Sequence, residues 1–251
     1  MGWLHEGHRS LMARSRLENA TSVVTIFVNP RQFNSPGDLA RYPRDEGRDL
    51  RICGEQGVDV VFAPPVEEVY PPGFSTTVSV GPLANVLEGA ARPGHFDGVA
   101  TVVSILFNLV GADGAYFGQK DAQQVMVIER MARDLGIATR VVACPTVREP
   151  DGLALSSRNV HLGPAERAAA PVLHGALLAA REAWQSGERD GAALREQIRR
   201  HLAEEPLAAV EYVSCADAAS LEEVEHVERP ALLSLAVRFG PTRLIDNERL
   251  G

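Results

Sequence analysis

Two histidines three residues apart stand near the start of the sequence, in the element His5-Glu6-Gly7-His8. The residues that follow, 9–19, carry apolar side chains at helical spacing, so we expect a helix there. A phosphate group at the start of that helix would meet free backbone N–H groups and the positive end of the helix dipole, with both imidazoles able to donate to it. Gly7 lets the backbone come close. The alternative is an exposed loop with two incidental histidines.

A lysine marks a second junction, Phe117-Gly118-Gln119-Lys120-Asp121, where a predicted strand ends and a predicted helix begins. A lysine in a first helical turn opposes the helix dipole, which fits a site that receives an anion. Gln124 lies one turn beyond it on the same face. The alternative is a surface lysine paired with Asp121, but the carboxyl end of a sheet strand favours a functional role.

The run Ser156-Ser157-Arg158 follows a tight turn at residues 149–152. Two hydroxyls and a guanidinium suit the oxygens of a triphosphate. The alternative is a polar loop that caps the next helix, which serine does routinely.

Uncharged amides occur at Asn29 and Gln32, in a long loop after a predicted strand. Such amides can hold a hydroxyl and a carboxyl group, although amides in proline-rich loops more often only make turns. Arg92 and His95 could add positive charge, and a loop that leads into a helix explains them equally well.

Composition narrows the class of protein. The 251 residues are 45% hydrophobic and carry 25 basic against 33 acidic residues, a net charge of −8, which argues against a nucleic-acid binder. Three isolated cysteines suggest neither a zinc knuckle nor a disulfide framework, so a reducing cytoplasm is the default. The apolar stretch 99–110 is too short to cross a membrane, and no GxxxxGK[ST] loop, Ser-His-Asp elbow or paired acidic dyad is present.

The hydrophobic pattern predicts alternating helices and strands up to about residue 147. Strands are expected at 21–28, 58–62, 111–117 and 140–143, helices at 9–19, 45–56, 99–110 and 119–135, and a long loop at 29–44. This alternation indicates an α/β fold with a parallel sheet. The remainder predicts a helix over 163–185, in which Pro171 marks a kink or the true start, a helix over 191–203, and strands at 210–215, 232–238 and 243–245. We therefore expect two domains, residues 1–147 and a smaller α+β domain of residues 148–251.

Six motifs follow one another along the chain: His5-Glu6-Gly7-His8, Ile26-Phe27-Val28-Asn29-Pro30-Arg31-Gln32-Phe33, Arg41-Tyr42-Pro43-Arg44, Arg92-Pro93-Gly94-His95-Phe96, Phe117-Gly118-Gln119-Lys120-Asp121 with Gln123-Gln124, and Arg148-Glu149-Pro150-Asp151-Gly152 with Ser156-Ser157-Arg158-Asn159. In this order they closely resemble the pantothenate synthetase family, and the match ends with Thr242-Arg243-Leu244-Ile245-Asp246-Asn247. Each motif is weak alone; the ordered set is highly specific.

The resemblance implies an ATP-dependent ligase of the nucleotidyltransferase superfamily, with a Rossmann-like domain, a C-terminal lid domain and a cytoplasmic homodimer without nucleic-acid or membrane partners. In this family the carboxylate of pantoate attacks the α-phosphate of Mg-ATP to give pantoyl adenylate and pyrophosphate. The amine of β-alanine then displaces AMP to give pantothenate. We expect Mg²⁺ to be carried on the ATP phosphates; the sequence does not identify metal ligands.

The resemblance also assigns residues. The catalytic residues are expected to be His8 (the proton-donor position), His5, Lys120 and Arg158. ATP is expected to contact Met1, Gly2, Trp3, Leu4, His5, Glu6, Gly7, His8, Gly118, Gln119, Lys120, Asp121, Val147, Leu155, Ser156, Ser157 and Arg158. Pantoate and β-alanine are expected to contact Gln32, Gln124, Asn29, His95 and Arg92.

The sequence departs from the family pattern at three places. Leu155 replaces a methionine and Ala122 replaces an aromatic residue. Because neither position supplies a hydrogen-bond donor to phosphate, we expect these two changes to have modest effects. Family members also carry a strand and a helix ahead of the His-x-Gly-His element. The first strand of a doubly wound sheet is central and buried on both faces, so its loss would be costly. Three interpretations are open: the start lies further upstream, the chain is a fragment, or neighbouring strands close the gap.

Two competing functions remain open. One is an adenylyltransferase of the same superfamily that joins AMP to a phosphate ester, which would not need β-alanine. Asn29, Gln32 and Gln124 suit a polyol carboxylate and favour the ligase instead. The other is a truncated, catalytically impaired remnant that binds nucleotide poorly, an interpretation that rests on the missing strand.

Overall fold

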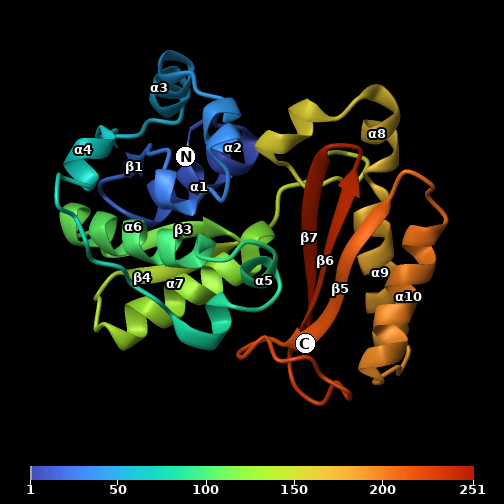
Figure 1. The fold of residues 1–251 in the computed structure, drawn as a ribbon. Coiled ribbons are helices and arrows are strands. Elements are labelled where there is room, and N and C mark those ends of the chain that lie inside the picture. The colour runs from blue at the N-terminus through green and yellow to red at the C-terminus, as the bar shows by residue number, and fades with distance from the viewer. Residues whose placement is uncertain (1) are drawn as a thin grey trace. The chain divides into compact units, whose positions relative to one another are not determined.

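The computed structural model describes residues 2–251, apart from the side chain of Asp38. The chain divides into two compact units, Met1–Pro145 and Thr146–Gly251 (Figure 1). No helix in the described part of the chain is long and apolar enough to span a membrane.

The first unit alternates helices with short parallel strands. Its elements are α1 (Glu6–Glu18), β1 (Val23–Thr25), η1 (Pro30–Gln32), α2 (Pro36–Arg41), α3 (Glu46–Glu55), β2 (Val60–Phe62), α4 (Val66–Val69), η2 (Gly81–Ala84), α5 (Glu88–Ala91), α6 (His95–Val110), β3 (Gly114–Gly118), η3 (Gln119–Asp121), α7 (Ala122–Asp134) and β4 (Arg140–Cys144), where η marks a 3-10 turn. The predicted α/β class with parallel strands is confirmed, because β1 pairs parallel with β2 and β3 with β4.

Several predicted boundaries were wrong. The helix expected from residue 9 begins at Glu6, because His5 caps it. The strand expected over residues 21–28 is only Val23–Thr25, and its residues are half-buried rather than buried. The loop expected over 29–44 contains η1 and α2, whose first residues are Pro30 and Pro36. Proline is favourable there because its fixed φ suits the first turn and its missing N–H is not needed.

The parallel strands form two separate two-stranded sheets, β1–β2 and β3–β4, among the described residues. The described strands of this unit therefore do not form one continuous sheet, which the third interpretation, closure of the gap by neighbouring strands, would require. Every strand in a two-stranded sheet is an edge strand; all residues of β1 and β3 are half-buried, whereas β4 buries Val142 and Cys144. The burial in this unit comes instead from helices: α6 buries ten of its residues, from His95 to Phe107, and packs against α7.

The second unit is an antiparallel sheet covered by helices. It contains η4 (Ser157–His161), α8 (Pro164–Ala169), α9 (Val172–Gln185), α10 (Gly191–Ala203), β5 (Ala209–Asp217), β6 (Ala231–Phe239) and β7 (Thr242–Leu250). Strand β6 pairs with β5 on one side and β7 on the other. The expected smaller α+β unit is confirmed, and Pro171 is the residue from which α9 begins.

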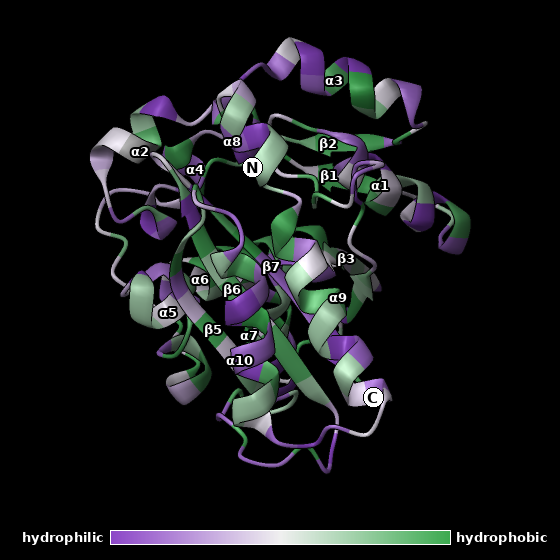
Figure 2. Cartoon of the chain, turned by 90° about the vertical axis from the view of Figure 1, so that its right-hand side faces the viewer, coloured by the Kyte–Doolittle hydropathy of each residue, from purple (hydrophilic) through white to green (hydrophobic). Residues whose placement is uncertain are grey.

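The core of this unit lies between the sheet and two amphipathic helices, α9 and α10 (Figures 1 and 2). Helix α9 contacts β6 and β7, and α10 contacts β5. Leu177, Leu194 and Ile198 supply the helical side and Leu233 and Leu235 the strand side, all fully buried. The central strand β6 is buried along nearly its whole length, because it has a partner on both edges.

We expect Leu233→Ala to lower the free energy of unfolding of the second unit by about 2 to 5 kcal/mol, because a fully buried leucine leaves a cavity when truncated. Urea unfolding followed by far-UV circular dichroism measures the change. Leu207→Ala removes the same atoms from a side chain that is 44% exposed. Equal shifts of the urea midpoint for the two variants would contradict this description of the core.

Candidate active site

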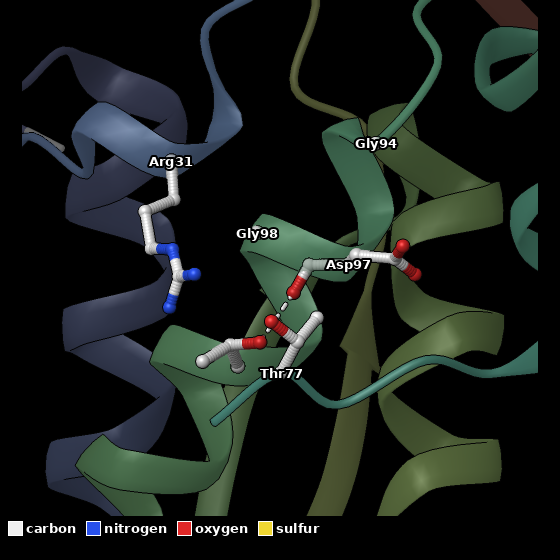
Figure 3. Close-up of a pocket in the computed structure, with 6 residues that line it drawn as sticks. Arg31, Thr77, Gly94, Asp97 and Gly98 are labelled. Carbon is white, nitrogen blue, oxygen red and sulfur yellow. Dashed lines mark hydrogen bonds between the residues drawn. The ribbon is translucent and has the colours of Figure 1, made fainter. Parts of the chain in front are cut away.

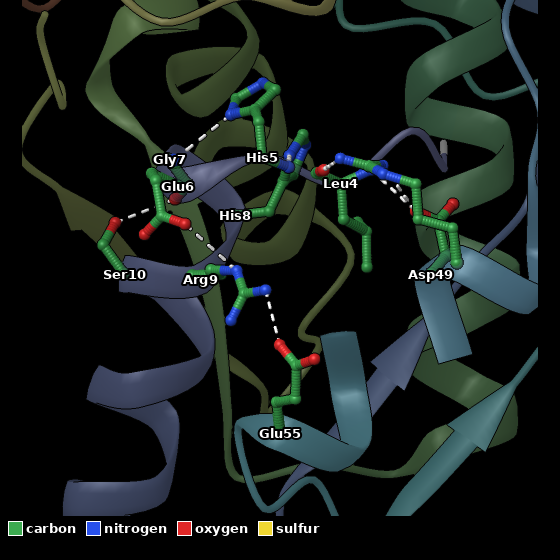
Figure 4. A network of polar contacts seen from close by, with 10 residues as sticks. Leu4, His5, Glu6, Gly7, His8, Arg9, Ser10, Asp49 and Glu55 are labelled. Carbon is green, nitrogen blue, oxygen red and sulfur yellow. Dashed lines mark hydrogen bonds and ion pairs between the residues drawn. The ribbon is translucent and has the colours of Figure 1, made fainter. Parts of the chain in front are cut away.

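The two histidines of the His-x-Gly-His element cap helix α1. The backbone N–H of Gly7 donates to Nδ1 of His5 at 3.2 Å, and the backbone N–H of His5 donates to Nδ1 of His8 at 3.2 Å (Figure 4). This reciprocal arrangement is a capping box in which imidazoles replace the usual hydroxyl and carboxylate. The two ring centroids lie 4.0 Å apart. Local helix chemistry therefore fixes both rings at the start of α1.

These hydrogen bonds assign the tautomer of both rings. A neutral imidazole has one N–H and one acceptor nitrogen, and Nδ1 is the acceptor in each ring, so the proton lies on Nε2. Burial lowers the pKa of His5 to about 4, with a further contribution from the positive charge of Lys120. Burial, followed by the neighbouring His5, lowers the pKa of His8 to about 3. At neutral pH the helix start thus offers two uncharged Nε2–H donors.

Lys120 lies at the carboxyl end of β3, in η3 rather than in the first turn of the α-helix that its sequence context predicts. It is the only lysine in the sequence, although arginine is abundant. Its side chain is 15% exposed and its Nζ is 3.7 Å from Oδ1 of Asp121. Because its charge lowers the pKa of His5, the ammonium and the two imidazoles share one electrostatic environment. A cation next to helix N–H groups and neutral donors is suited to bind phosphate oxygens.

A second polar cluster forms around Asn29, which is almost completely buried. Its Nδ2 donates to Oε1 of Gln32 at 3.1 Å and to the carbonyl of Gly98 at 3.0 Å. Its Oδ1 accepts from the hydroxyl of Tyr70 at 2.8 Å. Both polar atoms of the Asn29 amide are therefore hydrogen-bonded to protein groups, and its Nδ2 holds the side-chain oxygen of Gln32.

Arg92 and His95 bind the backbone of the same glutamine. The Gln32 carbonyl lies 2.8 Å from Nδ1 of His95 and 3.0 Å from Nη2 of Arg92. Nδ1 therefore donates, and Nε2 of His95 accepts from Arg92 at 3.3 Å. Burial and the Arg92 charge lower the pKa of His95 to about 4, so the ring is neutral. Both ring nitrogens are thus engaged in holding Gln32 and Arg92.

The negative charge of Asp121 links the two clusters, because it raises the pKa of both His5 and His95 against the effect of burial. Gln124 is half-buried on α7, next to this region in sequence, with no hydrogen-bond partner among the described residues. A cavity of about 210 Å³ beside Gly98 is lined by Arg31, Thr77, Gly94, Asp97, Gly98 and Thr101 (Figure 3). The carboxylate of Asp97 points away from the Arg31 guanidinium, so the cavity is not a paired-charge site.

The remaining predicted residues lie on one hairpin of the second unit. The backbone N–H of Leu155 donates to the carbonyl of Val147 at 3.0 Å. Ser156 Oγ accepts from the backbone N–H of Arg158 at 3.2 Å and caps η4, so the capping alternative describes its local structure correctly. The guanidinium of Arg158 is exposed and has no partner among the described residues. The hydroxyl of Ser157 lies in the same turn.

Sequence reasoning missed the groups that support these loops. Arg148 binds Asp246 of β7 through two nitrogens, at 2.6 and 3.0 Å, and so attaches the hairpin to the sheet of the second unit. Arg148 and Asp246 both belong to family motifs, but the sequence does not predict that they form an ion pair. Tyr70, Arg48 and Asp49 lay outside every motif. Met1, also predicted to contact ATP, lies outside the described residues.

The lowered pKa values predict a pH dependence of stability. A histidine with an ordinary pKa of 6.5 when unfolded but about 3 when folded stabilises the protein fully above pH 6.5, and this contribution is lost as pH falls toward 3. We expect His8→Gln to flatten the stability profile between pH 6.5 and 4, because glutamine keeps the capping acceptor but does not titrate. Urea unfolding at several pH values measures this. A variant with the profile of the parent would contradict the assignment of His8 as buried and neutral.

Comparison with known proteins identifies the family of the chain. The family model for pantoate–β-alanine ligase matches residues 1–249. The pantothenate synthetase of Roseiflexus castenholzii is 60% identical over 247 residues, 98% of this chain and 89% of that protein. A crystal structure of pantothenate synthetase from Thermus thermophilus has a TM-score of 0.95 at 50% identity, covering 99% of this chain and 90% of that one. A pantoate–β-alanine ligase from Francisella tularensis, complexed with β-γ ATP and β-alanine, has a TM-score of 0.79 at 35% identity and covers 99% and 86%. The chain belongs to the pantoate–β-alanine ligase family.

Proposed function

We propose that the chain condenses pantoate with β-alanine at the expense of ATP, in two steps. The pantoate carboxylate attacks the α-phosphate of ATP, which forms the acyl–phosphate bond of pantoyl adenylate and releases pyrophosphate. The β-alanine amine then attacks the acyl carbon, which forms the amide of pantothenate and releases AMP. The observation that carries the proposal is the set of groups around the start of α1 that can donate hydrogen bonds to phosphate oxygens. The family model for pantoate–β-alanine ligase matches residues 1–249 of the same chain.

In the first step negative charge builds on the α-phosphate and on the departing pyrophosphate. The Nε2–H groups of His5 and His8, the ammonium of Lys120 and the N-terminus of α1 are donors already held in place, so they stabilise that charge without reorganising. In the resting protein His8 is a neutral donor rather than an acid. An anionic phosphate against the ring would raise its pKa, which is the direction that a proton-donor role requires.

Gln32 is the group best placed to hold pantoate. Asn29 occupies its side-chain oxygen, which leaves its N–H₂ to donate to a ligand oxygen. His95 and Arg92 fix its backbone. We propose that Gln124 supplies the second amide and that Asn29, His95 and Arg92 act mainly by shaping this pocket. The negative charge of Asp121 acts on both His95 in this pocket and His5 at the start of α1. This fits a pantoate carboxylate that must reach the α-phosphate of ATP.

The proposal assigns the triphosphate tail to Ser156, Ser157 and the unpartnered guanidinium of Arg158, and nucleotide contacts to residues 2–8, 118–121, Val147 and Leu155. Among the described residues no group of three His, Cys, Asp or Glu side chains is arranged to bind a metal. From the family resemblance we propose that Mg²⁺ would be held chiefly by the ATP phosphates, where it would neutralise charge during the transfer. A homodimer and a cytoplasmic location are proposed from the family resemblance.

The decisive experiment incubates the purified chain with ATP, pantoate and Mg²⁺, with and without β-alanine. We expect pyrophosphate without β-alanine, limited to about one equivalent per enzyme by retention of the adenylate, and AMP with turnover when β-alanine is added. Sustained pyrophosphate release that ignores β-alanine would indicate the related adenylyltransferase. A folded protein that releases neither product would indicate an inactive remnant.

Lys120→Ala should lower the rate of pyrophosphate release in a single turnover by about 10²-fold or more, because one preorganised donor is lost from the charged transition state. The melting temperature should change little, since this ammonium opposes the adjacent helix dipole. Arg130→Ala is the matched control, because it removes a cation from α7 that is exposed and paired with Asp134. Equal turnover for the two variants would remove Lys120 from the site.

The single lysine allows an independent test. An amine-reactive acylating reagent can modify only Lys120 and the N-terminal amine of this sequence. We expect Mg-ATP to protect Lys120 from the reagent, as read by mass spectrometry of the peptide that contains it. Unchanged modification at saturating ATP would contradict contact between Lys120 and the nucleotide.

A further inference from the structure

Helix α3 holds the backbone just ahead of His5 through one buried carboxylate. Asp49 is 1% exposed. Its Oδ2 accepts from the N–H of Trp3 at 2.7 Å. Its Oδ1 accepts from the N–H of Leu4 at 2.8 Å, and Leu4 and Asp49 face each other in Figure 4. Both oxygens of one side chain therefore bind two successive N–H groups, 45 and 46 residues away in sequence.

The neighbouring Arg48 binds the same short segment. Its Nη2 donates to the carbonyl of Leu4 at 2.8 Å, and its guanidinium lies over the Trp3 ring, 4.8 Å from the centroid. Its Nη1 is 3.4 Å from Oδ1 of Asp49, so the buried carboxylate has a cation beside it. Two consecutive residues of α3 thus bind every polar backbone group of Leu4 and the N–H of Trp3.

The held segment has a conformation that it would not favour alone. Trp3 has a φ of +53° and Gly2 a φ of +89°, both in the left-handed region. That region is costly for a residue with a Cβ and persists only where surrounding structure imposes it. At Gly2 a Cβ would lie 3.1 Å from Oδ2 of Asp49, so a side chain there would crowd the carboxylate. The Asp49 and Arg48 contacts are the structure that imposes this turn.

The direction of the His5 ring depends on this turn. Leu4 is buried with Met12, Ile52 and Cys53, so the apolar side of the segment is anchored to α1 and α3. His5 follows directly, in extended conformation, and its Nδ1 is committed to the N–H of Gly7. A shift of Leu4 would therefore move the N-cap, and with it the Nε2–H of both capping histidines, relative to Lys120.

We propose that Asp49 and Arg48 are positioning residues for adenylation: they touch no substrate but fix the residue 3–4 segment so that both histidine Nε2–H groups face the phosphates. This inference rests on the proposed function. Misplacement of a transition-state donor by about 1 Å can cost about a hundredfold in rate, so residues this far from the chemistry can matter. The side chains of α3 would then set the efficiency of ATP use, whereas pantoate binding at Asn29 and Gln32 would not depend on them.

The test compares Asp49→Asn with Asp45→Asn. Both remove one negative charge from the start of α3, but Asp45 is exposed and only caps the helix, which asparagine does equally well. In Asp49→Asn one acceptor oxygen becomes an N–H₂ that faces a backbone donor. We expect kcat/KM for ATP to fall by about ten- to a hundredfold, with KM for pantoate within about twofold of the parent. Asp45→Asn should match the parent in both.

The second readout is the side-chain ¹⁵N shifts of His5 and His8, measured without substrates. We expect the Nε2–H tautomer in all three proteins, because the bonds that fix it lie within residues 5–8. The Nε2 shifts of His5 and His8 should match in the parent and in Asp45→Asn and change in Asp49→Asn, because the rings move relative to the charge of Lys120. A variant with a lowered melting temperature but unchanged histidine shifts and unchanged kcat/KM for ATP, assayed below its melting temperature, would overturn the proposal. If the parent itself forms no AMP, the proposed function fails, and the histidine shifts still decide the positioning role.

Should Asp49→Asn fail to fold, Arg48→Lys takes its place. Lysine keeps the charge beside Asp49 but cannot both bind the Leu4 carbonyl and stack on Trp3 in the manner of a planar guanidinium. The expected result is a loss of about tenfold in kcat/KM for ATP with pantoate KM unchanged. Parental kinetics and parental histidine shifts in this variant would overturn the proposal.

Discussion

Two hydrogen bonds from backbone N–H groups to imidazole Nδ1 atoms set the chemistry of the whole site. The first N–H groups of a helix need hydrogen-bond acceptors. Here the side chains that accept these bonds are also the ones proposed to donate hydrogen bonds to phosphate. The need for capping at α1 therefore decides which nitrogen of His5 and of His8 carries the proton. Burial then keeps both rings uncharged. Lys120 brings the permanent positive charge, so charge and hydrogen-bond donation come from different residues.

The rest of the first unit can be understood as support for this arrangement. Its parallel strands are short and half-buried, so they provide little rigidity alone. Buried polar contacts between segments distant in sequence supply it instead: Asp49 binds the residues before α1, Asn29 binds Gly98, and His95 binds Gln32. A buried, satisfied polar network allows few alternative arrangements, because breaking any one bond leaves an unpaired group in a poor solvent. In the second unit, the Arg148–Asp246 pair attaches the hairpin that carries Ser156 and Arg158 in the same manner.

Much of the fold followed from the hydrophobic pattern. Helices α3, α9 and α10 lie close to where their periodicity placed them, and Pro171 begins α9, one of the two outcomes expected from its missing N–H. Prediction was poor at β1, where a β-branched run of eight residues gives a strand of three, and at β7, where a predicted strand of three residues, 243–245, is nine residues long. Strand length depends on a hydrogen-bonding partner at each edge, which the apolar pattern does not reveal. The early start of α1 was missed because histidine is not a usual capping residue.

The sequence by itself determined the order and chemical types of the motifs, and these were enough to indicate the family. It also determined the local geometry of the His-x-Gly-His element, because capping involves residues only two or three positions apart. Only the tertiary structure decided that Asp49, Asn29 and Tyr70 hold the loops of the candidate site in the first unit, and that Asp246 holds the hairpin of the second unit. These residues act across separations of 41 to 98 positions. An isolated aspartate or amide looks the same in a sequence whether it faces water or a buried backbone N–H, so only the fold distinguishes the two.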